Sequence, residues 1–168
     1  MIEKLLEDRI ETAGEYVAEI IYGANDGIIT TFAVVSGVAG ASLQPAVVVI
    51  LGFANLFADG FSMGMSNYLS RRSEIAYRKA QEKESIDKRG PVKTAFATFI
   101  AFIIAGWIPL IPYIFGISPL FYWSIGFTAL VFFAVGASRS LVTDRKWYIN
   151  GLEMLAVGMV AAAVAFSI

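Results

Sequence analysis

Two stretches of the chain place acidic, amide and thioether side chains within otherwise apolar sequence. Glu19 and Asp26 lie seven residues apart in the first stretch, so on a helix they would share a face about two turns apart. In the second stretch, Asn55, Asp59 and Met63 follow the spacing i, i+4, i+8, which forms one stripe along a helix. Carboxylates supply charge and hard oxygen ligands, and a thioether favours a transition metal over calcium or magnesium. The pattern predicts a path for a divalent cation.

These residues also have plainer interpretations, and the sequence leaves them open. Met63 could simply fill space between helices, and Asn55 could hydrogen-bond to a neighbouring helix. Ionisable groups within apolar helices are costly and usually functional. Asp26 and Asp59 are therefore the strongest candidates for metal ligands.

A further acid, Glu153, lies in the apolar C-terminal stretch, two turns beyond Lys146. It could be a third metal ligand or a proton site. It could equally form an ion pair with Arg139 or Arg145, which precede it in the chain. The sequence does not separate these roles.

The composition indicates a membrane protein and excludes several kinds of site. Hydrophobic residues make up 57% of the 168 residues, and the mean hydropathy is +0.67. Residues 20–70 contain two acids and no base, and residues 94–138 contain no charge. A soluble domain would need charge along most of its surface, whereas a bilayer removes that need. Because the chain has no His and no Cys, any metal must bind to oxygen and methionine sulfur.

The apolar stretches predict an all-α, polytopic membrane protein with five transmembrane helices in a single domain, residues 1–168. A helix needs about 20 mostly apolar residues to cross a bilayer. Turn residues separate the candidate spans, and Pro109 and Pro112 should kink the third span or end its regular part. The five predicted spans are Ile20–Ala41, Ala46–Leu69, Thr94–Ile117, Leu120–Val142 and Trp147–Ile168.

The basic residues predict the orientation of these spans. All 13 Lys and Arg precede the first span, lie between the second and third, or flank the turn between the fourth and fifth. With five spans, these three regions fall on one side of the membrane. The positive-inside rule then places the N-terminus in the cytoplasm and the C-terminus outside.

Two cytoplasmic segments are predicted beside the spans. Residues 1–18 fit an amphipathic helix, whose acidic face either gathers cations or is only the solvated face of an interfacial helix. Residues 71–93 form a short basic linker that suits contact with anionic lipid headgroups. Residues 71–89 should extend the second span as a helix into the cytoplasm.

Small residues repeat on the same stretches as the acids. Gly23 and Gly27 are four residues apart, as are Gly60 and Gly64. This spacing lets helix backbones approach closely. It predicts that the first two spans pack tightly against each other or against a second copy of the chain.

The segments YGANDGIITTFAVVSGVAGAS and GFANLFADGFSMGMSNYLSRRSE resemble the vacuolar iron transporter family. The close match covers the first two predicted spans, and its most specific features are the Asp-Gly pair in the first span and Ser-Met-Gly in the second. The five-span plan and the GLE motif at Gly151–Glu153 extend the resemblance loosely to the whole chain.

The resemblance implies a homodimer that moves Fe²⁺, and also Mn²⁺, out of the cytoplasm in exchange for protons along a path at the dimer interface. It matches Asp26 to the family's pathway aspartate, Met63 to its pathway methionine and Glu19 to a further pathway acid. Asn55 stands where the family usually has glutamate, and Asp59 follows one turn later. The exact ligand set therefore departs from the family pattern.

The short linker is a second departure. Familiar members insert a long cytoplasmic domain, rich in Glu and Met, between the second and third spans, where this chain has only residues 71–93. The linker acids Glu74, Glu82 and Glu84 cannot be equated with that metal-collecting site. Metal capture must be simpler here, or must involve the acidic N-terminal helix.

We therefore expect a proton-coupled metal exporter in a lipid bilayer, with no catalytic residues, no tightly bound cofactor and no nucleic-acid partner. A short chain without a targeting segment suggests a prokaryotic cell membrane. One alternative is a membrane metal sensor or scaffold that does not transport. Another is an intramembrane aspartic protease, but the chain has Ala58-Asp59-Gly60 in place of the Gly-x-Gly-Asp motif of such enzymes.

Overall fold

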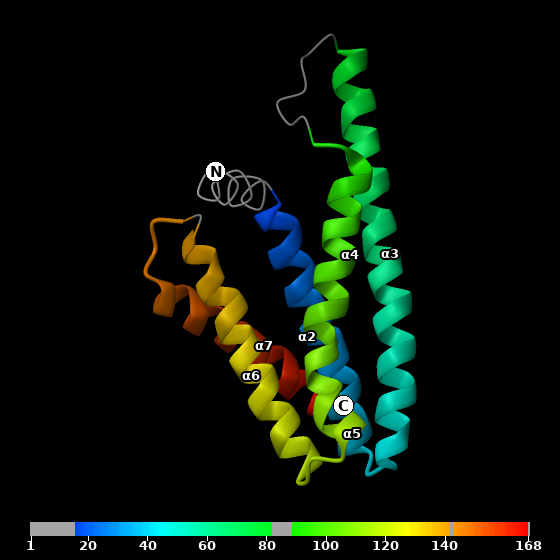
Figure 1. The fold of residues 1–168 in the computed structure, drawn as a ribbon, viewed down its shortest axis with the longest axis vertical. Helices are drawn as coiled ribbons and strands as arrows, with labels where there is room; N and C mark the ends of the chain where they lie inside the picture. The colour runs from blue at the N-terminus through cyan, green and yellow to red at the C-terminus, as the bar shows by residue number, and fades with distance from the viewer. Residues whose placement is uncertain (1–15, 82–88, 142, 168) are drawn as a thin grey trace, which may run out of the picture.

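The computed structural model of the chain describes residues 16–81, 89–141 and 143–167 (Figure 1). All regular structure in these ranges is helical, which confirms the all-α prediction. The N-terminal part of the predicted amphipathic helix and linker residues 82–88 lie outside the described residues. The elements are α2 (Val17–Gly40), α3 (Pro45–Ala80), α4 (Pro91–Trp107), the 3-10 turn η1 (Ile108–Leu110), α5 (Ile111–Phe115), α6 (Leu120–Ser138), the 3-10 turn η2 (Arg139–Leu141) and α7 (Trp147–Ser167).

Proline determines where several of these elements begin and end. Pro45 and Pro91 occupy the first positions of α3 and α4, where a missing N–H costs nothing, and each follows a residue with extended backbone. Pro109 and Pro112 lie beyond Trp107, where α4 gives way to η1 and then to α5. The prediction that these two prolines end the regular part of the third span is confirmed. The predicted helical extension of the second span over residues 71–89 is confirmed as far as Ala80, where α3 ends, and residues 82–88 lie outside the described part of the chain.

Four helical segments in the described part of the chain are long and apolar enough to cross a membrane: Pro45–Ala80, Pro91–Phe115, Leu120–Ser138 and Trp147–Ser167. The helix α2 is 24 residues long and is not among them. Its polar residues, Glu19, Asn25 and Asp26 among them, lower its hydropathy. However, α2 contacts α3, α4, α6 and α7, so neighbouring helices cover much of its surface. The fifth crossing therefore stays a prediction.

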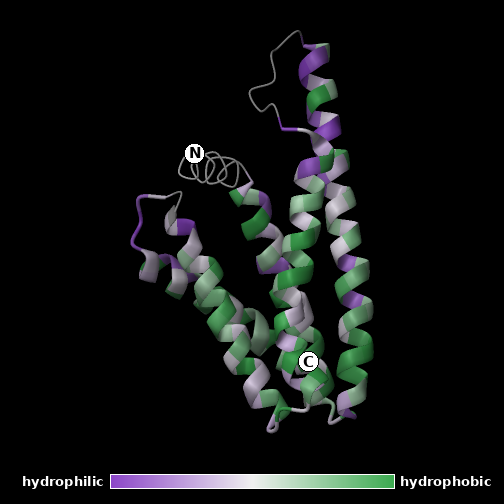
Figure 2. Cartoon of the chain, viewed as in Figure 1, coloured by the Kyte–Doolittle hydropathy of each residue, from purple (hydrophilic) through white to green (hydrophobic). Residues whose placement is uncertain are grey.

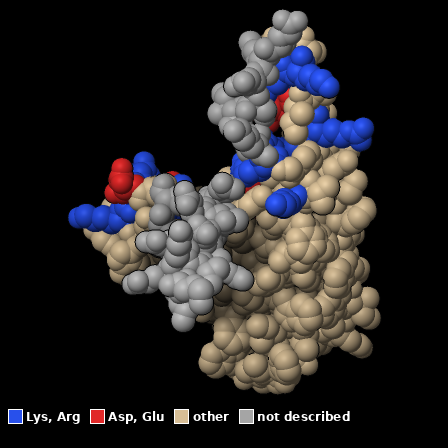
Figure 3. Space-filling model, turned by 45° about the horizontal axis from the view of Figure 1, so that its top comes forward, with Lys and Arg blue, Asp and Glu red and all other residues tan. Residues whose placement is uncertain are grey.

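The charged residues gather at one end of the bundle. Successive long helices run in opposite directions, so α2, α4 and α7 begin at the end where α3 and α6 finish (Figure 1). Hydrophilic residues are concentrated at this end, while the long middle of the bundle is mainly apolar (Figure 2). In the space-filling view the Lys and Arg side chains lie there as well, above an uncharged body (Figure 3). We call this the basic end. Which side of a membrane it faces stays a prediction.

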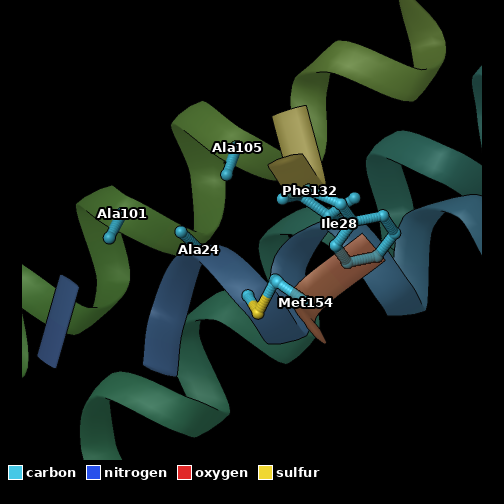
Figure 4. Packing of buried hydrophobic residues seen from close by; sticks show 6 residues of the cluster. All are labelled: Ala24, Ile28, Ala101, Ala105, Phe132 and Met154. Atoms are coloured by element: carbon cyan, nitrogen blue, oxygen red, sulfur yellow. The ribbon is translucent and has the colours of Figure 1, made fainter. Parts of the chain in front are cut away.

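The helix α2 lies at the centre of the packed core. Its small side chains allow α4 to approach closely, and larger side chains from α6 and α7 fill the remaining space (Figure 4). Burying these apolar groups together fixes α2 against three other helices. The core cluster consists of Ala24 and Ile28 of α2, Ala101 and Ala105 of α4, Phe132 of α6 and Met154 of α7.

The paired glycines of the first two spans face α4. A methyl group on Gly23 or Gly27 would collide with the α4 backbone, at the carbonyl of Phe102 in the second case. Gly60 and Gly64 of α3 also face α4. The first two spans do contact each other, but the closest neighbour of these four glycines is α4, and packing against a second copy of the chain stays a prediction. Small-residue spacing reveals a face that accepts a close neighbour, but it does not say which helix supplies that neighbour.

Candidate functional site: a polar path along α2 and α3

Asp26 and Asp59 lie on neighbouring helices and interact with each other. Both side chains are partly buried, and the charge of Asp59 on α3 acts on the Asp26 carboxylate on α2. The nearby Thr30 Oγ1 donates its hydrogen bond to the backbone oxygen of Asp26 at 2.9 Å, so it does not occupy that carboxylate. The structure therefore brings together the two acids that the sequence favoured most. Two carboxylates on facing helices can share one divalent cation.

Met63 faces a polar hollow at the α2–α3 boundary. The hollow has a volume of about 270 Å³ and differs from two larger hollows, of about 400 and 500 Å³, whose linings are almost wholly apolar. Met63 lies one helical turn beyond Asp59, so its thioether separates the acid pair from this hollow. Met63 is partly buried and lines this hollow, and its role as a metal ligand stays a prediction. We call the hollow the vestibule, defined by its lining residues Tyr22, Met63, Ser66, Asn67, Ser70 and Arg71.

Three asparagines beside these groups have buried polar atoms for which the described residues provide no hydrogen-bond partner. The atoms are Oδ1 of Asn25, Nδ2 of Asn55 and Oδ1 of Asn67. Buried polar atoms in folded proteins are nearly always paired with protein or water. On α3, Asn55 lies one turn before Asp59 and Asn67 one turn after Met63. The face from Asn55 to Asn67 therefore offers polar atoms that water or a cation can satisfy.

Glu19 is held by an arginine. Its carboxylate is 8% exposed, and its Oε2 lies 2.8 Å from Nη1 of Arg89, just before α4. The guanidinium of Arg89 also lies over the ring of Tyr16, 5.6 Å from its centre. This ion pair connects the start of α2 to the start of α4, two segments that are 70 residues apart in the chain. The negative charge of Glu19 is therefore largely neutralised within the protein.

Glu153 also faces arginine. Its Oε2 lies 3.6 Å from Nη1 of Arg139 and 3.6 Å from Nη1 of Arg145, and its side chain is 49% exposed. Of the roles that the sequence left open, the geometry favours the ion pair. Within the described ranges, no three acidic side chains come close enough together to hold one metal ion. The acid pair of Asp26 and Asp59 is thus the centre of the candidate site.

Several residues of this region escaped the sequence-based prediction. Asn67 and Ser70 continue the spacing of the Asn55 stripe by further helical turns, so a longer search along that face would have found them. Arg71 also lines the vestibule and continues this stripe four residues beyond Asn67, whereas no sequence pattern relates Tyr22 of α2 to it. The ion pair between Glu19 and Arg89 could be identified only from the tertiary structure, because it depends on how α4 packs on α2.

Comparison with known proteins places this arrangement in a family. The model of the VIT family matches residues 17–89 and 80–168. The chain belongs to the VIT family. Because four of its helices are long and apolar enough to cross a bilayer, this VIT protein is a multi-pass membrane protein.

Individual relatives share the name of the family. Vacuolar iron transporter 1 of Eucalyptus grandis is 25% identical over 225 aligned positions, which cover 98% of this chain and 90% of that protein. The vacuolar iron transporter of Plasmodium berghei is 46% identical over 69 residues, covering 41% of this chain and 25% of that protein. Vacuolar iron transporter 1 of Arabidopsis thaliana is 34% identical over 94 residues, covering 56% of this chain and 38% of that protein.

The VIT match is broken at the linker between α3 and α4. Its two pieces overlap at residues 80–89, and the Eucalyptus alignment spans 225 positions although this chain has 168 residues. That relative therefore contains segments that this chain lacks. A missing insertion at the linker would produce such a break, which agrees with the expectation of a short family member.

Proposed function

We propose that this VIT protein exports a divalent transition metal from the cytoplasm in exchange for protons, with Fe²⁺ as the first candidate cargo and Mn²⁺ as the second. The observation that supports this most directly is the interaction of Asp26 with Asp59, one turn from the Met63 thioether. Two carboxylates and a soft sulfur form a donor set for a transition metal. The names of the relatives, which are iron transporters, support Fe²⁺.

A second copy of the chain would complete this donor set. One described chain brings only two acids together, fewer ligands than a divalent cation usually takes from oxygen donors. Large apolar side chains are exposed beside the path, including Tyr22 of α2 and Phe57 and Phe61 of α3. We propose that two copies pair through this surface, so that each contributes Asp26, Asp59 and Met63. The molecular mass of the protein in detergent tests this pairing.

Proton exchange follows from the chemistry of paired acids. Carboxylates close together in a medium of low dielectric constant repel each other when both are ionised. An arriving metal ion stabilises the ionised forms and displaces protons, and protons from the opposite side release the metal. In this scheme the proton gradient drives export without a nucleotide.

The test is transport by purified protein in liposomes. We expect Fe²⁺ movement that depends on an imposed pH gradient. Asp26→Asn and Asp59→Asn should each lower the rate at least about tenfold, because each removes a charged ligand. Asp144→Asn removes the same charge from the exposed turn between α6 and α7 and should leave the rate unchanged. Movement of Fe²⁺ that ignores the pH gradient would refute the proton coupling, and an active Asp26→Asn variant would refute the site.

The alternatives predict different results. A metal sensor or scaffold would bind Fe²⁺, for example with a raised melting temperature in detergent, but would show no flux into liposomes. A protease would cleave membrane peptides. The VIT family and the relatives named as transporters lend no support to that activity. The cell membrane as the location stays a prediction, because the relatives named above are vacuolar transporters by name.

A further inference from the structure

A long apolar groove runs along α4 on the side that faces α6. It has a volume of about 500 Å³ and is lined by Ile20 of α2, by α4 and η1 residues between Phe96 and Ile108, and by Val131 and Val135 of α6. From Phe96 to Ile108 the chain rises by about 18 Å, which is close to the roughly 15 Å depth of one leaflet of the hydrocarbon core. We call this hollow the α4–α6 groove.

The arrangement of three helices produces this groove. The helix α6 contacts η1, just beyond α4, and from there α4 and α6 spread apart toward the basic end (Figure 1). Both helices pack on α2. Ala24 of α2 and Ala101 and Ala105 of α4 line the groove with small side chains, which leave space between the helices (Figure 4). The groove therefore follows from the way these helices pack.

The described residues leave the walls of the groove uncovered. Phe96 is 63% exposed, Ile104 64% and Ile20 42%. Because α4 and α6 both belong to segments long and apolar enough to cross a bilayer, lipid acyl chains lie beside them. A groove about one leaflet deep fits such a chain. Filling the groove also supplies contacts that its lining would otherwise lack.

A basic residue lies at the head of the groove. Lys93 shares the face of α4 that carries Phe96, Ala97 and Ile100, at spacings of three, four and seven residues. Its side chain is exposed, and no acid in the described ranges forms an ion pair with it. A lysine at this position can lay its aliphatic stem along the groove and place its ammonium group at the level of the lipid headgroups.

The acids near the groove do not oppose an anion at this position. Glu19 lies 2.8 Å from Arg89. On the opposite wall, Arg139 follows the groove residue Val135 by four positions, and its Nη1 lies 3.6 Å from Oε2 of Glu153. Both of these acids therefore lie against arginine, whereas Lys93 remains to attract an anion.

We propose that the α4–α6 groove binds one anionic phospholipid, with an acyl chain along α4 and the phosphate beside Lys93. Basic residues beside an apolar pocket between membrane helices suit lipid headgroups, and the cytoplasmic leaflet, where we predict the basic end to lie, is negatively charged. Ala24 follows Tyr22 by two residues, or about 200° around α2, so the groove and the vestibule lie on opposite sides of this helix. Bound lipid would leave the vestibule free.

Native mass spectrometry of the full chain, released from detergent micelles, tests this binding. Phosphatidylglycerol and phosphatidylcholine with identical acyl chains are added in separate titrations. We expect one phosphatidylglycerol per chain, with a Kd at least about fivefold lower than that of phosphatidylcholine. Lys93→Gln should raise the Kd of phosphatidylglycerol about fivefold and leave that of phosphatidylcholine unchanged. Lys79→Gln removes the same charge from an exposed position of α3 outside the groove and should change neither Kd.

A second pair of variants tests the position of the acyl chain. Ala97 lines the α4–α6 groove, whereas Ala95 lines the separate hollow between α3 and α4, and both are half-buried. Ala97→Phe fills part of the groove and should raise the Kd of both lipids at least about threefold, because fewer methylene groups can be buried. Ala95→Phe makes the same change outside the groove and should leave both Kd values unchanged. Melting temperatures without added lipid check that the variants are folded.

The outcomes are distinct. If both lipids bind equally, or if Lys79→Gln weakens phosphatidylglycerol as much as Lys93→Gln does, the bases attract lipid only diffusely and the proposal fails. Unchanged binding by Ala97→Phe would place the lipid outside the groove and would also overturn the proposal. Because no metal enters these measurements, they do not depend on the proposed transport function.

Discussion

Arginine neutralises two of the four acids that the sequence suggested as metal ligands. Glu19 pairs with Arg89, and Glu153 lies near Arg139 and Arg145. The other two acids, on α2 and α3, interact electrostatically with each other, and their role as metal ligands stays a prediction. At the residue scale, therefore, similar acids have different roles because of the charges placed beside them.

The role of Glu19 can be tested by exchanging its charge with that of Arg89. Arg89→Gln should lower stability by about 3 kcal/mol, because it removes the partner of the buried Glu19 carboxylate, and Glu19→Gln should lower it less. The double exchange Glu19→Arg with Arg89→Glu should recover at least half of the stability and of the Fe²⁺ transport. Thermal unfolding in detergent and liposome flux measure the two effects. If Glu19 is a metal ligand, the exchanged protein will be stable but inactive.

The thioether of Met63 is expected to distinguish soft from hard cations. Met63→Leu keeps the size of the side chain and removes the sulfur, so KM for Fe²⁺ should rise about three- to tenfold and competition by Mg²⁺ should increase. Met65→Leu makes the same change on an exposed part of the same helix. Equal effects of the two substitutions would show that the sulfur of Met63 is not a ligand.

The helix α4 supports the candidate site at the scale of whole elements. Both glycine pairs contact it, so it packs behind α2 and α3 and holds the helices of the two acids at a fixed separation. The prolines that follow Trp107 end this support where the chain turns toward α6. Tight packing of α4 thus positions Asp26 and Asp59, although both residues belong to other helices.

Substitution of α2 glycines tests this support. Gly27→Ala would bring a methyl group against the carbonyl of Phe102 and should destabilise the protein by about 1–3 kcal/mol. Gly37→Ala is the matched control in the same helix, because nothing lies within 4 Å of the added methyl. It should be neutral or slightly stabilising, since alanine favours helix. Melting temperatures in detergent compare them, and equal values would contradict the close approach of α2 and α4.

At the scale of the whole molecule, the described bases lie at one end and an apolar surface surrounds the rest. This polarity orients the molecule relative to a membrane and places the vestibule near the basic end. Four helices qualify as spans by length and composition, and the polar helix α2 lies among them. If α2 crosses the bilayer, the two ends of this helix lie on opposite sides of the membrane. If it does not, they lie on the same side.

Single cysteines can determine the topology, because the chain has no native Cys. Ala18→Cys and Ser42→Cys place a thiol at the two ends of α2. If α2 crosses the membrane and the basic end is cytoplasmic, a membrane-impermeant thiol reagent added to cells will label only Ser42→Cys. Ser73→Cys, at the basic end, should be labelled only after permeabilisation. Labelling of Ala18→Cys and Ser42→Cys from the same side would exclude five spans.

The sequence by itself determined the helical membrane class, the approximate positions of the long helices and the candidate acids. Apolar stretches, prolines and turn residues act locally, so their effects can be predicted from neighbouring residues alone. The i, i+4 spacing of Asn55, Asp59 and Met63 also defines one face of one helix without knowledge of the rest.

Only the tertiary structure decided which groups face that stripe. The packing of α4 on both glycine pairs, the pairing of Glu19 with Arg89 and the position of Tyr22 at the vestibule all depend on contacts between segments far apart in the chain. Such contacts follow from how several helices fill space together, and a periodic pattern on one helix does not identify its partner. For this reason the sequence predicted the path, whereas the structure showed which of its acids pair with arginine.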